Sequence, residues 1–164
     1  MIACLDAGYG SDKVIAACVL FRDWRDEHSA GEITACLNGV MSYVPGRFYL
    51  RELPALLAVL GRVTDPPETL VVDGYVWLDV RQSPGLGAHL YEAMGRKMPV
   101  IGVAKTVYRG APAVGIVRGK GRRPLYITAV GIQPEEAAKR ILIMHGPFRL
   151  PTLLRRTDSL CRSK

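Results

Sequence analysis

The sequence lacks the long apolar runs that a membrane protein needs. No stretch approaches the roughly 20 consecutive apolar residues of a membrane-spanning helix. The N-terminus lacks the positively charged region of a secretory signal and begins directly with an apolar, strand-like run. Repeats, low-complexity tracts and linkers are also absent from the sequence. We therefore expect a single domain spanning residues 1–164, cytoplasmic and without a membrane partner.

Cysteine is scarce, and its spacing differs from that of a metal site. The sequence contains four cysteines, Cys4, Cys18, Cys36 and Cys161, and none of them forms a C-x-x-C pair. This spacing argues against a zinc motif or a disulfide framework. Three of the four lie within apolar, strand-like runs. We therefore expect buried free thiols in a reducing compartment.

Acidic residues are outnumbered by basic ones. The chain carries 22 lysines and arginines against 15 acidic residues, which gives a net charge of +7 and a pI near 9.5. A basic surface favours polyanions such as nucleic acid, acidic lipid or acidic protein. Charge alone fits a merely soluble basic protein equally well. The 164 residues, nearly half of them apolar, suffice for a sizeable core.

The apolar pattern predicts an α/β domain with a mixed sheet. Three closely spaced strands come first, as in an antiparallel meander, and helices then alternate with short, wholly apolar strands, which we expect to be parallel. The expected strands cover residues 1–8, 13–22, 31–38, 69–73, 99–104, 113–118 and 124–130, and the expected helices residues 53–63, 85–96, 133–145 and 152–161. This order fits a sheet flanked by helices. It is also the order of the ribonuclease-H-like fold.

Three carboxylates lie where burial makes a charge costly. Asp6 and Asp73 each end an apolar run, and Glu52 opens an apolar, helix-like stretch. Ligands collect at the carboxyl ends of strands in open α/β sheets, and adjacent carboxylates repel unless they share a proton or a cation. Mg²⁺ suits such a site because it prefers oxygen ligands and keeps waters that act on phosphate. Alternatively, either aspartate alone merely caps a turn.

Two further segments invite a functional interpretation. Lys105 ends the apolar run 100–104, where an ammonium group could hold a phosphate, although a lone lysine there is more often a surface residue. Tyr43 precedes a Pro45-Gly46 turn and could present a rigid wedge to a base stack. The alternative is a simple turn whose tyrosine packs inward.

Together these segments resemble the endonuclease V family, repair nucleases that act on deoxyinosine and, in some members, on inosine in RNA. The resemblance covers nearly the whole chain, in the family's order and spacing. The matching segments are Leu5-Asp6, Tyr43-Val44-Pro45-Gly46, Arg51-Glu52 with Pro54, Val71-Val72-Asp73-Gly74, Gly87-Ala88-His89-Leu90, Pro99-Val100-Ile101-Gly102-Val103-Ala104-Lys105, Pro124-Leu125-Tyr126-Ile127 and Arg149-Leu150-Pro151.

The resemblance implies a ribonuclease-H-like fold and hydrolysis of a phosphodiester on the 3′ side of the modified nucleotide, dependent on Mg²⁺ or Mn²⁺. By the family's pattern, Asp6 and Asp73 would bind the metal, and Glu52 would hold the metal or its water. Lys105 would lie near the scissile phosphate. The expected nucleic-acid contacts are Tyr43, Val44, Pro45 and Gly46, which would form the wedge, with Gly74, Arg81 and Lys105. We expect a monomer whose partner is DNA, RNA or both, single strands included.

Several departures from the family's pattern leave alternatives open. Asp79 stands where the family has a histidine six residues after its third acid, and it is either a fourth acid beside the metal or a solvated loop residue. The run 126–131 lacks a second family histidine, the region after Lys105 is abbreviated, and no helical segment precedes the first strand. The alternatives are a nuclease for another structured nucleic acid and a non-catalytic nucleic-acid-binding relative. Candidate phosphate contacts are Arg47, Arg51, Arg81, Arg109, Lys120, Arg122 and Arg123.

Overall fold

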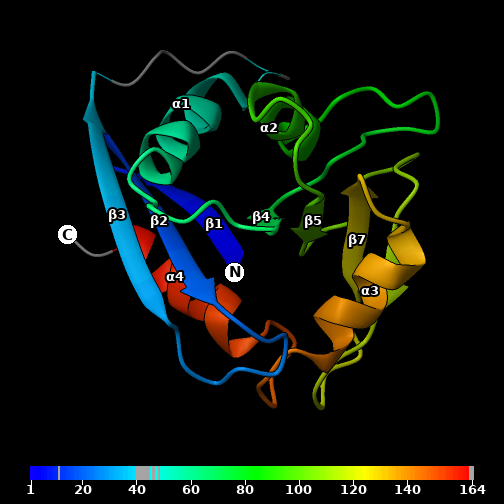
Figure 1. Cartoon of the computed structure of the whole chain (residues 1–164). Coiled ribbons are helices and arrows are strands. Elements are labelled where there is room, and N and C mark those ends of the chain that lie inside the picture. Colours follow the sequence, from blue (N-terminus) through cyan, green and yellow to red (C-terminus); the bar gives the residue numbers. More distant parts are fainter. Residues whose placement is uncertain (11, 40–44, 46, 48, 163–164) are drawn as a thin grey trace.

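The computed structural model describes residues 1–10, 12–39, 45, 47 and 49–162, and within them it forms one seven-stranded sheet with helices on both faces (Figure 1). The order of the strands across the sheet is β3-β2-β1-β4-β5-β7-β6. The strands are β1 (Ile2–Tyr9), β2 (Lys13–Phe21), β3 (Gly31–Asn38), β4 (Thr69–Asp73), β5 (Val100–Ala104), β6 (Val114–Ile116) and β7 (Leu125–Val130), and the helices are α1 (Tyr49–Leu60), α2 (Leu86–Ala93), α3 (Pro134–Ile143) and α4 (Thr152–Arg162).

The sheet is mixed, as the sequence predicts. β1, β2 and β3 pair as an antiparallel meander. β4 pairs parallel with β1 on one side and with β5 on the other, and β7 then pairs antiparallel with β5 and β6. β4 and β5 carry no polar alternation because both of their faces are covered. The prediction of a meander joined to parallel strands and flanked by helices is confirmed.

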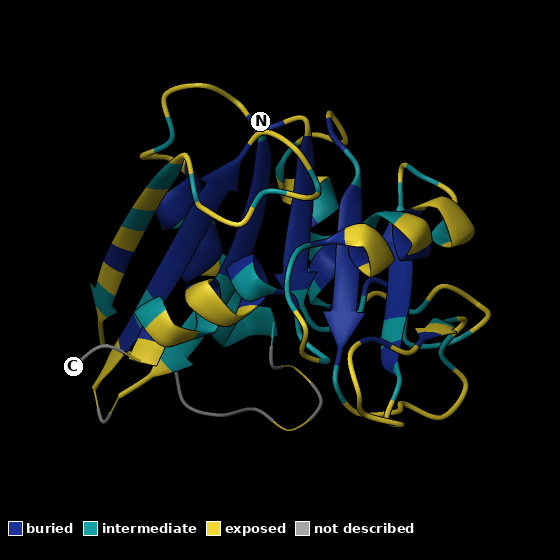
Figure 2. Ribbon diagram, turned by 90° about the horizontal axis from the view of Figure 1, so that it is seen from below, coloured by how far each residue is buried: buried dark blue, intermediate teal, exposed yellow. Residues whose placement is uncertain are grey.

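Alternate side chains of the strands enter two separate cores. Leu5 of β1 and Val72 of β4 pack with α1 and α2 on one face, whereas Cys4 and Val71 pack with α3 and α4 on the other. In Figure 1, α1 and α2 lie above the sheet and α3 and α4 lie below it. Figure 2 shows the buried strands between helices whose outer surfaces are exposed. A side chain's position along a strand therefore decides which pair of helices it meets.

Helix α1 begins earlier than predicted, at Tyr49 rather than at residue 53. The backbone N–H of Leu50 donates to the carbonyl of Arg47, and the Tyr49 ring stacks on His89 of α2 with centroids 3.6 Å apart. Glu52 consequently belongs to the first turn of the helix. Pro54 falls in the second turn of the helix, and because it has no N–H it cannot donate the usual helical hydrogen bond to the Leu50 carbonyl.

The thiols differ in one respect from the prediction. All four cysteines are free, and Cys4, Cys18 and Cys161 are buried. Cys36 is exposed, so the expectation of a buried thiol is wrong there, because β3 is an edge strand whose alternate residues face solvent. In the described part of the chain, no helix has both the length and the apolar character needed to cross a membrane.

Candidate functional site

Two aspartates lie side by side where β1 and β4 part. The last parallel pair of these strands is Leu5 with Val72, and Asp6 and Asp73 follow directly. Asp6 follows Cys4 by two residues, and Asp73 follows Val71 by two. Because side chains alternate along a strand, both aspartates face the side of the sheet that α4 covers. Asp73 is the last residue of β4, as predicted. Asp6 does not end its strand, because β1 continues to Tyr9 through antiparallel pairing with β2.

A third aspartate, Asp158, reaches these two from α4. One carboxylate oxygen from each of Asp6, Asp73 and Asp158 lies within 4.8 Å of the others. Sequence reasoning missed Asp158. A signal for it exists, because Asp158 follows Leu154 by four residues and precedes Cys161 by three, and both of those side chains are buried. The aspartate therefore lies at the edge of the helix face that packs on the sheet.

The carboxylate of Asp6 is costly to keep charged in this cluster. Burial, which is the largest cause, and the negative charge of Asp73 together raise the pKa of its carboxyl from 3.8 to about 7. The described partner of this carboxylate is the backbone N–H of Ala7, 2.8 Å from Oδ1. A divalent cation among the three carboxylates would relieve both the desolvation and the repulsion. The donor set therefore fits a hard metal ion.

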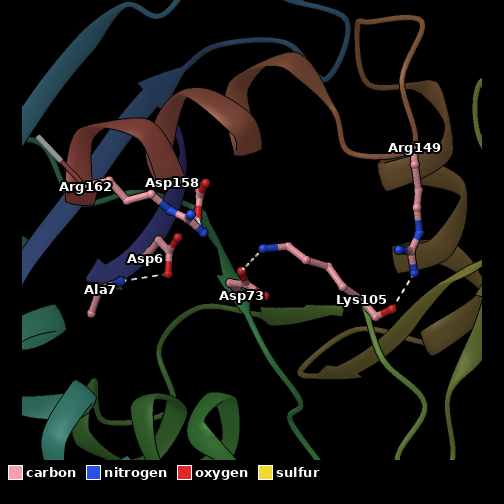
Figure 3. Close-up of polar contacts among 7 residues, drawn as sticks. All are labelled: Asp6, Ala7, Asp73, Lys105, Arg149, Asp158 and Arg162. Carbon is pink, nitrogen blue, oxygen red and sulfur yellow. Dashed lines mark hydrogen bonds and ion pairs between the residues drawn. The ribbon is translucent and has the colours of Figure 1, made fainter. Parts of the chain in front are cut away.

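A basic side chain contacts each of the other two aspartates (Figure 3). Lys105 Nζ lies 2.6 Å from Oδ2 of Asp73, and Arg162 Nη2 lies 2.9 Å from Oδ1 of Asp158. Burial by itself would lower the pKa of Lys105, but the contact with Asp73 outweighs it, so that this pKa is raised. Lys105 comes directly after β5, which brings its ammonium group beside the acidic cluster as the sequence predicts.

Glu52 faces the same cavity from the opposite side of the sheet. This cavity has a volume of about 560 Å³ and is lined by Asp6, Tyr9, Glu52, Lys105 and Asp158, among others. Glu52 is not one of the three clustered carboxylates. Burial raises the pKa of its carboxyl, and a hydrogen bond from the Tyr9 hydroxyl opposes that rise. The sequence predicted a trio of Asp6, Glu52 and Asp73. In the structure, Asp158 joins the two aspartates in the cluster, and Glu52 lies across the cavity from them.

A second cavity of about 350 Å³ adjoins the first, and Glu52 and Asp73 line both. Gly74 and three tyrosines, Tyr49, Tyr75 and Tyr108, contribute to its wall. The Tyr75 hydroxyl donates to the carbonyl of Thr106 at 2.7 Å and accepts from the N–H of Tyr108 at 3.0 Å. This hydrogen bonding holds the segment that follows Lys105 against the Gly74 turn.

A glycine in β5 explains how the Gly74 turn packs so closely on the sheet. A side chain at Gly102 would bring its Cβ within 2.5 Å of the Gly74 carbonyl oxygen and within 2.8 Å of Thr128 Oγ1. The same hydroxyl accepts from the N–H of Val76 at 2.8 Å. Gly102 thus leaves the space that the turn after Asp73 occupies.

Other predicted contacts do not reach these cavities. Arg81 lies exposed in the loop between β4 and α2 and lines neither cavity. Asp79, in the same loop, accepts from the Ser83 hydroxyl at 2.6 Å and from the N–H groups of Arg81 and Ser83, which favours its interpretation as a loop residue. Pro45 is an exposed turn residue. The remaining wedge residues, Tyr43, Val44 and Gly46, lie outside the described residues.

The candidate phosphate contacts are mostly surface residues. Arg51 lies over the ring of Tyr9, a residue that lines the first cavity, with its guanidinium carbon 4.4 Å from the ring centroid. Like Arg81, the remaining candidates are exposed: Arg47, Arg109, Lys120, Arg122 and Arg123.

The chain is similar to known proteins over most of its length. Residues 1–125 match the model of the endonuclease V family. Endonuclease V of Streptomyces avermitilis is 31% identical over 181 aligned residues, which cover 96% of this chain and 77% of that protein. Endonuclease V of Thermus thermophilus is 31% identical, with 94% of this chain and 77% of that protein covered.

Solved structures agree with this similarity. The crystal structure of the Streptomyces avermitilis protein matches with a TM-score of 0.78 at 30% identity, covering 98% of this chain and 79% of that one. Endonuclease V of Ciona intestinalis, solved with a 24mer DNA containing an inosine followed by a ribo-adenosine, matches with a TM-score of 0.76 at 16% identity. That match covers 98% of this chain and 84% of that one, and it shows a shared fold.

The mixed sheet with an acidic cluster beside its central strands, together with these similarities, defines a ribonuclease-H-like nuclease. Within that class, the chain belongs to the endonuclease V family. The resemblance stated from the sequence and the fold that it implied are both confirmed.

Proposed function

We propose that this protein is a metal-dependent endonuclease that hydrolyses a phosphodiester bond on the 3′ side of deoxyinosine or inosine in DNA or RNA, a reaction of nucleic-acid repair. The observation that carries the proposal is the convergence of Asp6, Asp73 and Asp158 within 4.8 Å. This cluster adjoins a cavity with three tyrosines in its wall. The net charge of +7 supports a nucleic-acid partner.

The cofactor that we propose is Mg²⁺, with Mn²⁺ as a substitute. Asp6, Asp73 and Asp158 offer the carboxylate oxygens that such ions prefer, and the raised pKa of Asp6 supports a site that takes a cation. Glu52 would hold the ion or its water from the other side of the cavity. When bound, the ion would supply an activated water and offset the charge that develops on the phosphate.

The remaining side chains of the cavity would act on the phosphate and on protons. Lys105 would donate a hydrogen bond from Nζ to a phosphate oxygen. This bond would replace its contact with Asp73. Glu52 would accept a proton from water, and the Tyr9 hydroxyl keeps that carboxylate oriented and favours its charged form. Arg162, beside Asp158, adds positive charge at the rim.

The tyrosine-lined cavity supports a substrate base that leaves its stack. Tyr49, Tyr75 and Tyr108 offer aromatic surface, and Gly74 offers backbone without a side chain. A purine held there would lie beside Asp73, which lines both cavities. The bond that is cut would then lie near the base that is recognised. The wedge proposed at residues 43–46 remains a prediction.

The experiment that tests this function is cleavage of end-labelled oligonucleotides, single- and double-stranded, of DNA and RNA, with and without one inosine. Each would be incubated with Mg²⁺, Mn²⁺ or a chelator, beside an Asp73→Asn variant. We expect a metal-dependent cut 3′ of inosine that the variant does not make. Binding without any cut would instead indicate a non-catalytic relative, and cutting indifferent to inosine would remove the proposed specificity.

A further inference from the structure

The loop between α3 and α4, residues 144–151, is closed at its base. The N–H of Thr152 donates to the carbonyl of His145 at 2.9 Å. Gly146 has a φ of +116°, and a Cβ there would lie 2.5 Å from Thr152 Oγ1, so only glycine fits this close approach. The start of α4, the helix that carries Asp158, is therefore fixed to the end of α3.

Arg118 braces this loop from within. Arg118 follows β6 by two residues, and its side chain is buried. Its guanidinium donates to the carbonyl of Phe148 at 2.9 Å, to that of Arg149 at 3.3 Å and to that of Met144. Several carbonyl oxygens thus offset the cost of burying the charge. The backbone on either side of Arg149 is held in place by these bonds.

Arg149 extends from the braced loop to the end of β5. Its Nη2 donates to the carbonyl of Lys105 and, at 2.6 Å, to the carbonyl of Pro124 just before β7. The last pair of the ladder between β5 and β7 is Ala104 with Tyr126, so Lys105 lies one residue beyond it. Arg149 supplies a donor to the Lys105 carbonyl where the strand ladder no longer does.

Lys105 is consequently held from two sides, as Figure 3 shows. Its carbonyl accepts from Arg149, while its side chain extends the other way to Asp73. One guanidinium therefore connects the backbone that carries this lysine to the loop that leads into α4 and Asp158.

We propose that Arg149 is a positioning residue of the nuclease site, which fixes Lys105 relative to the acidic cluster and to α4. This inference rests on the proposed function. A side chain that must meet a phosphate needs its backbone fixed, since a displacement of about 1 Å can lower a rate by about 10²-fold. Lysine at position 149 would keep the charge, but it would lose the fixed planar guanidinium whose Nη2 group donates to both carbonyls.

Steady-state cleavage of the inosine oligonucleotide by Arg149→Met, Arg149→Lys and Arg156→Met tests the proposal. Arg156 is the matched control, because it lies on α4 and makes a long-range contact of 2.7 Å with Glu32, yet lines neither cavity. We expect Arg149→Met to lower kcat by about 10- to 100-fold with KM within about twofold, and Arg149→Lys to recover only part of that loss. Arg156→Met should leave both constants unchanged.

A double-variant experiment separates positioning from general stability. In a Lys105→Met background, Arg149→Met should lower kcat by less than about twofold, because the group that Arg149 positions is already gone. If the full 10- to 100-fold loss persists in that background, the loss does not act through Lys105 and the proposal is wrong. An unchanged kcat in both Arg149 variants would overturn it as well.

Amide hydrogen exchange gives a readout that needs no activity. We expect Arg149→Met and Arg149→Lys to speed exchange at residues 105–108, where the amide of Thr106 belongs to the peptide group of the Lys105 carbonyl. Arg156→Met should not change it. If the wild-type protein cuts no substrate, the proposed function fails. If exchange at residues 105–108 is unchanged in the Arg149 variants, the proposal that Arg149 fixes the backbone of Lys105 is wrong, whatever the activity.

Discussion

Lys105 Nζ lies 2.6 Å from Oδ2 of Asp73, so an ammonium group occupies one side of the carboxylate proposed to hold a metal ion. The two side chains come from the ends of neighbouring parallel strands, β4 and β5. The contact offsets part of the negative charge of the three clustered aspartates. A divalent cation entering the site would meet this ammonium as a like charge.

Removal of the Lys105 charge should separate cleavage from metal binding. Lys105→Met is expected to lower the cleavage rate by about 10²-fold, because a charged donor to the phosphate is lost. It should nevertheless tighten Mg²⁺ binding by about threefold to tenfold, since a like charge near the ion is gone. Cleavage kinetics and calorimetric titration check the two effects, with the exposed Lys139→Met as control. Weaker Mg²⁺ binding in Lys105→Met would contradict the prediction.

Metal affinity should depend on pH through Asp6. The pKa of this carboxyl is raised to about 7, so below that pH a cation must displace a proton from it. As the pH rises toward 7, we expect Mg²⁺ affinity to increase by up to about tenfold per pH unit, and above pH 7 we expect it to level off. Titrations in buffers of different ionisation enthalpy would count the released proton. An affinity that is flat from pH 5.5 to 8 would show that Asp6 does not bind the metal.

The Asp6 carboxyl should also make the stability of the metal-free protein, measured with a chelator present, depend on pH. Its folded-state pKa of about 7 exceeds the ordinary 3.8, so the folded state binds the proton more tightly. That contribution is complete below about pH 4 and is lost as pH rises to about 7. Asp6→Asn should remove this loss and be more stable than the wild type at pH 8. Denaturant unfolding at pH 5 and pH 8 measures the free energy of unfolding of both proteins. If that free energy changes equally between the two pH values in the wild type and in Asp6→Asn, Asp6 is not the source.

Asp158 should matter as much as the two strand aspartates. Asp158→Asn is expected to weaken Mg²⁺ binding by about tenfold to a hundredfold and to reduce cleavage at least as much. Glu136→Gln on α3 is the matched control, because it also breaks an ion pair between residues four apart on a helix. Titration and cleavage assays compare the two variants. Equal behaviour of both would remove Asp158 from the metal site.

Local sequence patterns predicted most of the fold, because apolar period and turn residues act over short ranges. β4 ends at Asp73 as expected, since a wholly apolar run followed by Asp-Gly marks both the strand and its end. The start of α1 was misjudged because Tyr49 gains its helical position from stacking on His89, forty residues away. β6 ends at Ile116, earlier than the expected strand end at Arg118, and the Arg118 side chain is buried because distant carbonyls accept its hydrogen bonds.

The candidate site was predicted from the sequence where a charged residue adjoins an apolar run, as Asp6, Glu52, Asp73 and Lys105 do. Asp6 and Asp73 were found from the sequence because a carboxylate in a buried run is locally conspicuous. Asp158 was not found, since its helix has the pattern of an ordinary amphipathic helix and its nearness to Asp6 depends on how α4 crosses β1 and β2. The link between Arg149 and Lys105 joins residues 44 apart in sequence. No short-range pattern encodes contacts of this kind.

Gly102→Ala should destabilise the protein and disturb the metal site together. The added Cβ would lie 2.5 Å from the Gly74 carbonyl oxygen, so the turn after Asp73 must move. We expect a loss of about 1–3 kcal/mol in the free energy of unfolding, as for other overpacked positions, and weaker Mg²⁺ binding. Gly115→Ala is the control, because its nearest contact would be 3.8 Å away. Denaturant unfolding that does not distinguish the two variants would contradict the packing described here.

Tyr9→Phe should shift the pH dependence of cleavage without altering the fold. The Tyr9 hydroxyl donates to Glu52 and opposes the rise in the pKa of that carboxyl caused by burial. A hydrogen bond to a charged group contributes about 1.5–3 kcal/mol, so its loss should raise the pKa of Glu52 further. Because the protonated carboxyl cannot accept a proton, activity should fall by about tenfold at pH 6 and less at pH 8. Rate profiles of Tyr9→Phe and of the control Tyr91→Phe, whose ring lines neither cavity, measure this shift. A uniform loss at every pH would mean that Tyr9 acts on something other than the charge of Glu52.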